Sequence, residues 1–110
     1  MPIDPNKALW VIQQQLKELD VIYQDTMEGS LNTVSGTERV AKWRVRTIAL
    51  LNESVGEKEA QNFARLQPGM VYTNDLVEEF TDLVDCFRGP LKSLGQQIFK
   101  SRQLPSSGGS

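Results

Sequence analysis

Apolar residues recur along most of the chain at alternating steps of three and four, the spacing that places them on one face of an α-helix. Asp4 and Pro5 precede the first such stripe as an acidic N-cap and a proline at the first helical position. Trp10 and Val21 widen the stripe, and Gln15 lies on the predicted polar side. The members of the stripe are Leu9, Ile12, Leu16, Leu19 and Tyr23.

Two further helices are predicted in the middle of the chain. Residues 27–36 have the composition of a loop, and Ser35 to Glu38 fit a capping box that would begin the second helix. Trp43 and Thr47 lie on the apolar side of that helix, which Gly56 ends because glycine readily adopts positive φ. A short third helix over residues 57–66, with Ala60 and Phe63 on its apolar side, ends before Pro68-Gly69.

The last predicted helix begins near Thr73-Asn74-Asp75 and continues to about Arg102. Gly89-Pro90 interrupts it, and an interior proline removes a hydrogen bond at a cost of about 3 kcal/mol. The helix is therefore expected to kink or break there. With no alternating strand pattern elsewhere, the fold class is all-α, a four-helix bundle-like domain. The apolar stripe of this helix consists of Leu76, Phe80, Leu83, Phe87, Leu91, Leu94 and Ile98.

The composition fits one domain and excludes several kinds of site. The 110 residues match the usual size of a single domain, and the formal net charge is only −2. No histidine is present, which excludes Ser-His-Asp and Cys-His catalysis, histidine-ligated zinc and a histidine pH switch. The single Cys86 cannot form an intramolecular disulfide, and no apolar run has the length of a membrane span. We therefore expect a cytoplasmic protein with no membrane partner and no cofactor.

The C-terminal end differs in composition from the rest. Residues 1–104 are predicted to form the single helical domain, whereas residues 105–110, Pro-Ser-Ser-Gly-Gly-Ser, are typical of a flexible linker. Two interpretations follow. The chain is the N-terminal domain of a longer protein, or the last residues are the remnant of a tag on a small complete protein.

Basic residues gather on the predicted second helix. Arg39, Lys42 and Arg46 share one helical face, and Arg44 lies near them in sequence beside Trp43. Such a basic cluster can bind phosphate or a nucleic-acid backbone. The alternative is a solvated face, or partners for the acidic residues of the fourth helix.

Acidic residues gather on the first half of the fourth helix, at Glu78, Glu79, Asp82 and Asp85. Glu79 and Asp82 form an E-x-x-D pair that resembles half of the magnesium site in all-α nucleotide pyrophosphohydrolases of the MazG type. The upstream E-x-x-E of that family is missing here, and acids in a first turn also complement the helix dipole. A metal site would need a facing carboxylate pair, for which Glu18, Glu38, Glu57 and Glu59 are the available donors.

Four apolar residues are candidates for an interface. Trp10 lies beside the main stripe of the first helix, and the fourth helix outreaches the short third helix, which leaves Leu94, Ile98 and Phe99 without an obvious cover. Exposed apolar area of this kind usually marks an interface. The alternative is that the first helix packs antiparallel along the fourth and hides these residues.

The stretch Gly36-Thr37-Glu38-Arg39-Val40-Ala41-Lys42-Trp43 resembles the helical accessory or adaptor domains found at the N-terminus of bacterial multidomain effector or defence proteins. The resemblance implies an adaptor role and no catalytic residue. Together with the apolar candidates, it favours a non-enzymatic interaction module that mediates self-association or docking to a protein partner. Binding of anions or nucleic acid through the basic cluster is the first alternative, and a magnesium-dependent nucleotide pyrophosphohydrolase is the second.

Overall fold

The chain folds into four α-helices, and no strand is present among residues 4–29, 31–69 and 75–103, which are those that the computed structural model describes. The helices are α1 (Pro5–Glu28), α2 (Thr33–Ser54), α3 (Glu57–Ala64) and α4 (Leu76–Gln103). The predicted all-α fold with four helices is confirmed. The predicted helix start at Thr73 and Asn74 and the predicted linker over residues 105–110 lie outside the described residues.

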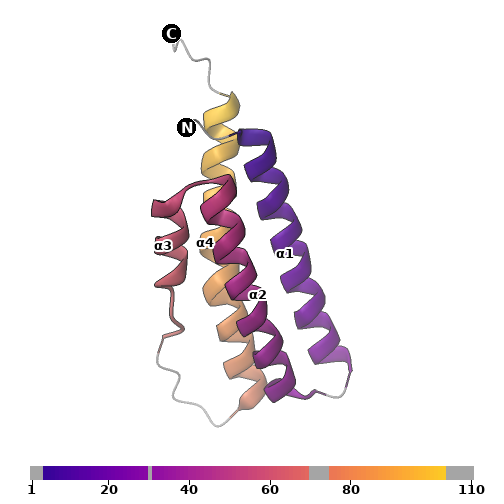
Figure 1. The fold of residues 1–110 in the computed structure, drawn as a ribbon. Coiled ribbons are helices and arrows are strands. Elements are labelled where there is room, and N and C mark those ends of the chain that lie inside the picture. Colours follow the sequence, from indigo (N-terminus) through magenta and orange to yellow (C-terminus); the bar gives the residue numbers. More distant parts are fainter. Residues whose placement is uncertain (1–3, 30, 70–74, 104–110) are drawn as a thin grey trace.

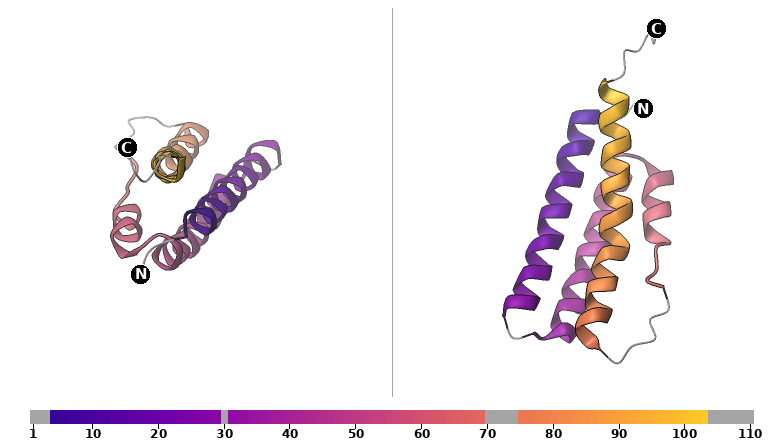
Figure 2. Two further views of the ribbon diagram at one scale, coloured as in Figure 1. Left: turned by 90° about the horizontal axis from the view of Figure 1, so that it is seen from above. Right: turned by 180° about the vertical axis from the view of Figure 1, so that it is seen from behind.

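Consecutive helices run in opposite directions, which gives the bundle an up-down-up-down order (Figure 1). α1 contacts α2 on one side and α4 on the other, while α3 packs mainly against α2. α3 has only 8 residues, against 24, 22 and 28 in α1, α2 and α4. It therefore covers α2 and α4 over only part of their length, whereas α1 runs along most of α4 (Figure 2).

Trp43 lies at the centre of the core and is fully buried, as predicted. Its ring meets Phe63 nearly edge-on at a centroid distance of 5.9 Å and lies 6.0 Å from the ring of Phe87. Its indole Nε1 donates a hydrogen bond of 2.8 Å to the carbonyl oxygen of Gln15. One residue thus connects α1, α2, α3 and α4, and the polar edge of its ring is satisfied.

Gln15 is buried, so its assignment to the polar side of the first helix is wrong. Its Nε2 donates to Oγ1 of Thr47 at 2.7 Å, and that hydroxyl donates to the carbonyl of Trp43 at 2.8 Å. The amide can enter the core because α2 supplies this acceptor, a feature that helical periodicity does not reveal. Val21 shows the opposite error, because it is exposed rather than part of the buried stripe.

The turn between α1 and α2 is shorter than predicted. Only residues 29–32 separate the two helices, instead of residues 27–36. Asn32 caps α2 by accepting a hydrogen bond of 3.1 Å from the backbone N–H of Ser35. The predicted capping box from Ser35 to Glu38 is therefore wrong, because both residues lie inside the helix that Asn32 begins.

Gly36 has a packing role rather than a role in a turn. A Cβ atom at this position would lie 2.6 Å from Oγ1 of Thr26 on α1 and 2.9 Å from the ring of Phe80 on α4. Three helices therefore meet at a point where a larger residue does not fit. Close packing of α1, α2 and α4 therefore accounts for the glycine at this position.

Other predicted helix ends are confirmed. Oδ1 of Asp4 accepts hydrogen bonds from the backbone N–H groups of Asn6 and Lys7, as expected of an N-cap. Gly56 has a φ of 143°, a conformation that favours glycine, and separates α2 from α3. Oδ1 of Asp75 accepts from the N–H groups of Val77 and Glu78 at the start of α4.

α4 continues through Gly89-Pro90 as one helix, so the predicted alternative of a break is wrong. Pro90 is exposed, and the residue before it is glycine, which lacks the Cβ that would clash with the proline ring in a helical conformation. The apolar stripe keeps its phase on both sides of Pro90, with Phe87 and Leu91 both buried. Packing of this stripe offsets the cost of the missing hydrogen bond. No helix in the described part of the chain combines the length and apolar character needed to cross a membrane.

Candidate functional site

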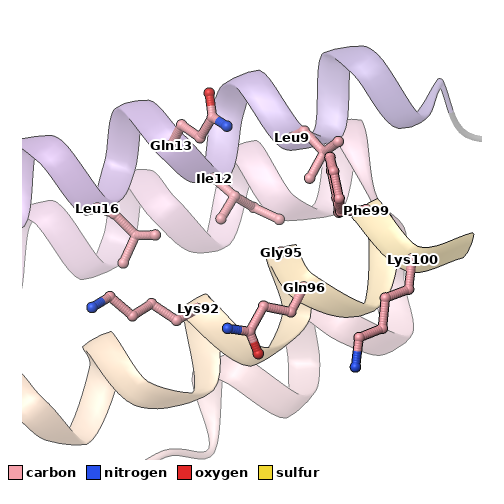
Figure 3. A pocket seen from close by; sticks show the side chains of 9 residues that line it. All are labelled: Leu9, Ile12, Gln13, Leu16, Lys92, Gly95, Gln96, Phe99 and Lys100. Carbon is pink, nitrogen blue, oxygen red and sulfur yellow. The ribbon is translucent and has the colours of Figure 1, made fainter. Parts of the chain in front are cut away.

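An open groove of about 610 Å³ lies between the first half of α1 and the second half of α4 (Figure 3). Its apolar lining comes from Leu9, Ile12, Leu16 and Phe99. Gln13, Gln96, Lys92 and Lys100 add polar atoms, and Gly95 completes the lining. These nine residues define the α1–α4 groove.

Gly95 sets the separation of the two helices in the groove. A Cβ atom on Gly95 would lie 3.2 Å from Cγ2 of Ile12, so the missing side chain lets Ile12 approach the backbone of α4 closely. Leu16 remains only half-buried beside this contact, while Ile12 itself is buried. The result is an apolar floor that the chain does not fully cover.

Two lysines give the groove a positive edge. Lys92 and Lys100 are exposed, and within the described ranges neither forms an ion pair with a carboxylate. In Figure 3 the Lys92 side chain extends into the gap between the two helices, whereas the Lys100 side chain points away from α1. An apolar floor with a cationic edge suits a ligand surface that is itself apolar with acidic neighbours.

The four predicted interface residues do not form one patch. Phe99 is 42% exposed and lines the groove, and Trp10 is 62% exposed on α1. Ile98 is buried in the core, so its assignment to an exposed patch is wrong. The antiparallel packing of α1 along α4, which the sequence left as the alternative, explains this burial in part, and Ile98 also lies beside Val55 at the end of α2.

Leu94 is half-buried and belongs to a different side of α4. It lines a small hollow together with Phe63 of α3 and with Leu66, which follows α3 in the sequence. Of the four candidates, only Phe99 therefore contributes to the α1–α4 groove. The role of the α1 residues in the groove could not be predicted from the sequence, because Leu9, Ile12 and Leu16 have the spacing of ordinary core positions.

The basic cluster is divided between two sides of α2. Arg39 forms an ion pair of 3.2 Å with Asp25, and Arg46 pairs with Glu18, both on α1. Lys42 is exposed and has no acidic partner in the part of the chain that is described. Both pairs connect α2 to α1 and not to the acidic residues of α4. Among the described residues, Lys42 and Arg44 form no ion pair with a carboxylate.

Arg44 has a structural role that the sequence did not reveal. Its guanidinium donates to the carbonyl oxygens of Ala64 and Leu66, the latter at 3.1 Å, and lies 5.2 Å from the centre of the Phe87 ring. It thereby attaches the C-terminal end of α3 to α2 and α4. A cation held in this way does not face a nucleic-acid backbone.

The acidic cluster lies along the outer side of α4. Glu78, Asp82 and Asp85 are exposed, and Asp85 pairs with Arg88 at 3.1 Å. Glu79 lines a hollow toward α2, in which Glu38 also takes part. Across residues 4–29, 31–69 and 75–103, no three Asp, Glu, Cys or His residues are grouped as a metal site requires. The facing carboxylate pair that magnesium chemistry needs is not assembled there.

Cys86 is half-buried. Burial raises the pKa of its thiol, and the positive charge of Arg44 opposes only part of that shift. The thiol is therefore less ionised at neutral pH than a free cysteine, which is the opposite of what a nucleophile requires.

Comparisons of the chain with known protein families, with curated proteins and with solved structures gave no match. Its function must therefore be inferred from the geometry of the bundle.

Proposed function

We propose that this domain is a protein-interaction module that self-associates through its α1–α4 face. We use this name for the α1–α4 groove together with the exposed sides of α1 and α4 beside it. The observation that carries the proposal is the groove itself, an apolar floor that remains open to solvent between two long helices. A bundle of this size could close such a seam with larger side chains, as it does elsewhere along the same two helices.

The exposed aromatic residues support an interface on this side of the molecule. Phe99 and Trp10 are large apolar residues that remain 42% and 62% exposed. Aromatic residues are enriched among those that contribute most to protein interfaces, because they bury a large area with little loss of side-chain freedom. A partner surface placed over the groove would cover Phe99 directly.

The charges of the face indicate the chemistry of the partner. The groove carries Lys92 and Lys100, so its partner should present carboxylates beside an apolar or neutral surface. The same face of the chain carries Asp82 and Asp85 closer to the start of α4. A second copy therefore supplies the required charge, and self-association needs no other component.

The proposal is tested by sedimentation velocity at low salt over a wide range of protein concentrations. We expect a concentration-dependent dimer that Phe99→Lys and Gln96→Glu each weaken by about tenfold or more, because Phe99→Lys removes apolar area from the interface and Gln96→Glu places a carboxylate against those of the partner. Gln96 is exposed, so its substitution leaves the core intact. Circular dichroism would verify that both variants remain helical.

A matched control lies on the other side of the bundle. Val45 on α2 is 67% exposed, so Val45→Lys introduces the same charge in place of an apolar residue away from the groove. The variant should dimerise like the unaltered chain. A strictly monomeric chain at high concentration, or a dimer that only Val45→Lys disrupts, would refute the proposal.

A further inference from the structure

The outward side of α4 presents the two charge signs in separate halves of one continuous strip. Spacings of three and four residues place its members on one face of the helix, and all of them are exposed. The acidic members come first along the helix and the basic member comes last, with Lys92 at the edge of the second half. The α4 strip consists of Asp82, Asp85, Gly89, Ser93, Gln96 and Lys100.

The strip is continuous with the α1–α4 groove. Gln96 and Lys100 belong to both, and Lys92 lines the groove as well (Figure 3). A partner that covers the groove therefore also lies against the second half of the strip. The residues of the partner that contact the second half of the strip must therefore be compatible with its positive charge.

A twofold axis imposes a strict condition on such a surface, because the same patch must be complementary to itself. We consider two copies of α4 that pack antiparallel and cross at the level of Leu91 along the helix axis. Asp82 of one copy then lies opposite Lys100 of the other, because both residues are about nine positions from that level. At the helical rise this is roughly 13 Å on either side of the axis. The pairing occurs twice in the dimer, and a parallel arrangement would instead bring like charges together.

The centre of the strip allows two helices to approach closely. Gly89 and Ser93 lie opposite each other in this arrangement and are the smallest members of the strip. A Cβ atom added at Gly89 would have no neighbour within 4 Å, in contrast to Gly36 and Gly95, whose missing side chains make room for residues of the same chain. The space above Gly89 is thus free for another molecule.

Resting on the proposed function, we infer that the partner on the α1–α4 face is a second copy of this chain, paired antiparallel along α4 about a twofold axis near Leu91. The size of the surface is adequate. A helix of 28 residues is about 42 Å long, and two neighbouring helices are about 20 Å wide, which gives about 800 Å² on each partner. This matches the area that standard stable protein interfaces bury.

The test is a charge exchange measured by sedimentation velocity of the whole chain at low salt. Asp82→Lys and Lys100→Glu should each weaken the dimer by about tenfold or more, because each places two like pairs in the interface. The double variant Asp82→Lys/Lys100→Glu restores opposite charges at both contacts. It should regain a dimer within about threefold of the unaltered affinity.

Two controls have the same charge change outside the strip. Glu53→Lys and Lys42→Glu alter exposed residues of α2 by the same amounts as Asp82→Lys and Lys100→Glu. Both should leave the dimer unchanged, and thermal unfolding would verify that all variants fold.

The possible failures are distinguishable. A dimer that Phe99→Lys weakens, but in which the double variant is no tighter than either single variant, would overturn the antiparallel register while leaving the proposed function intact. Assemblies that grow beyond dimers with concentration would overturn the twofold axis. A chain that remains monomeric would overturn both proposals.

Discussion

The contact between α1 and α4 has two halves that differ in aromatic packing, in ion pairs and in exposure to solvent. In the half near the α1–α2 turn, Tyr23 stacks parallel on Phe80 at 5.9 Å and its hydroxyl lies 3.1 Å from Oγ1 of Thr81. Arg88 covers the Tyr23 ring at 5.6 Å and pairs with Asp20 at 2.6 Å. These contacts seal the seam.

The other half of the same contact is open. Leu9, Ile12 and Leu16 face Gly95 and Phe99 across the α1–α4 groove, and no ion pair within the described residues connects the two helices there. The difference shows that one half of the contact between two helices can stabilise the fold while the other half remains accessible to a partner. Substitutions in the two halves should therefore affect different measurements.

The largest expected difference is between two phenylalanines of α4. Phe80 is buried in the sealed half, so Phe80→Ala should lower the free energy of unfolding by about 3–5 kcal/mol. Phe99 is 42% exposed in the open half, and Phe99→Ala should cost about 1 kcal/mol or less. Urea denaturation monitored by circular dichroism measures both.

The dependence of unfolding on urea should keep the same slope in these variants, which would show that the folded and unfolded states are unchanged in compactness. Equal losses of stability would break the distinction between the halves, because Phe99 would then be part of the core.

A smaller difference is expected between two glycines. A Cβ at Gly36 meets Thr26 and the buried Phe80 at less than 3.0 Å, so Gly36→Ala should destabilise the fold by about 1–3 kcal/mol. At Gly95 the Cβ would meet only Ile12, at 3.2 Å, beside an open groove into which that side chain can shift. There the higher helix propensity of alanine, worth about 1 kcal/mol, should offset the contact.

We therefore expect Gly95→Ala to change the midpoint of thermal unfolding little, whereas Gly36→Ala lowers it clearly. A large loss at Gly95 would mean that the open half is as tightly packed as the sealed one.

Features that depend on neighbouring residues in the chain could be predicted from the sequence. Asp4 caps α1 and Gly56 separates α2 from α3 because both act through the backbone close to them. Trp43 lies in the core because it falls on a wide apolar stripe. Local patterning was also sufficient for the fold class.

Features that depend on residues far apart in the sequence could not be predicted in this way. Gln15 is buried because Thr47 accepts its amide, and Gly36 is needed because Phe80 lies above it. Arg44 was grouped with the basic cluster, although its partners are carbonyls at the end of α3. The groove could not be predicted for the same reason, because its lining combines Leu9, Ile12 and Leu16 of α1 with residues of α4 that lie far away in the sequence.

The smallest expected effect concerns Cys86, which lies away from the groove. Burial raises the pKa of its thiol above the ordinary value of 9.0, so the unfolded chain loses this proton before the folded chain does. The contribution of the thiol to stability is therefore fully present below pH 9.0 and is lost as the pH rises through the folded pKa. Cys86→Ser should unfold with a weaker dependence on pH above 9.0 than the unaltered chain, as measured by urea denaturation.

The dilution dependence of the ¹H–¹⁵N NMR spectrum tests the central claim most directly, because it locates an interface without any substitution. Signals of Gly95, of the side-chain amides of Gln13 and Gln96, and of the exposed Trp10 indole should shift with concentration. The buried Trp43 indole, hydrogen-bonded to Gln15, should remain unchanged. Shifts confined to residues around Val45 on α2, or a spectrum that does not change with concentration, would contradict self-association through the α1–α4 face.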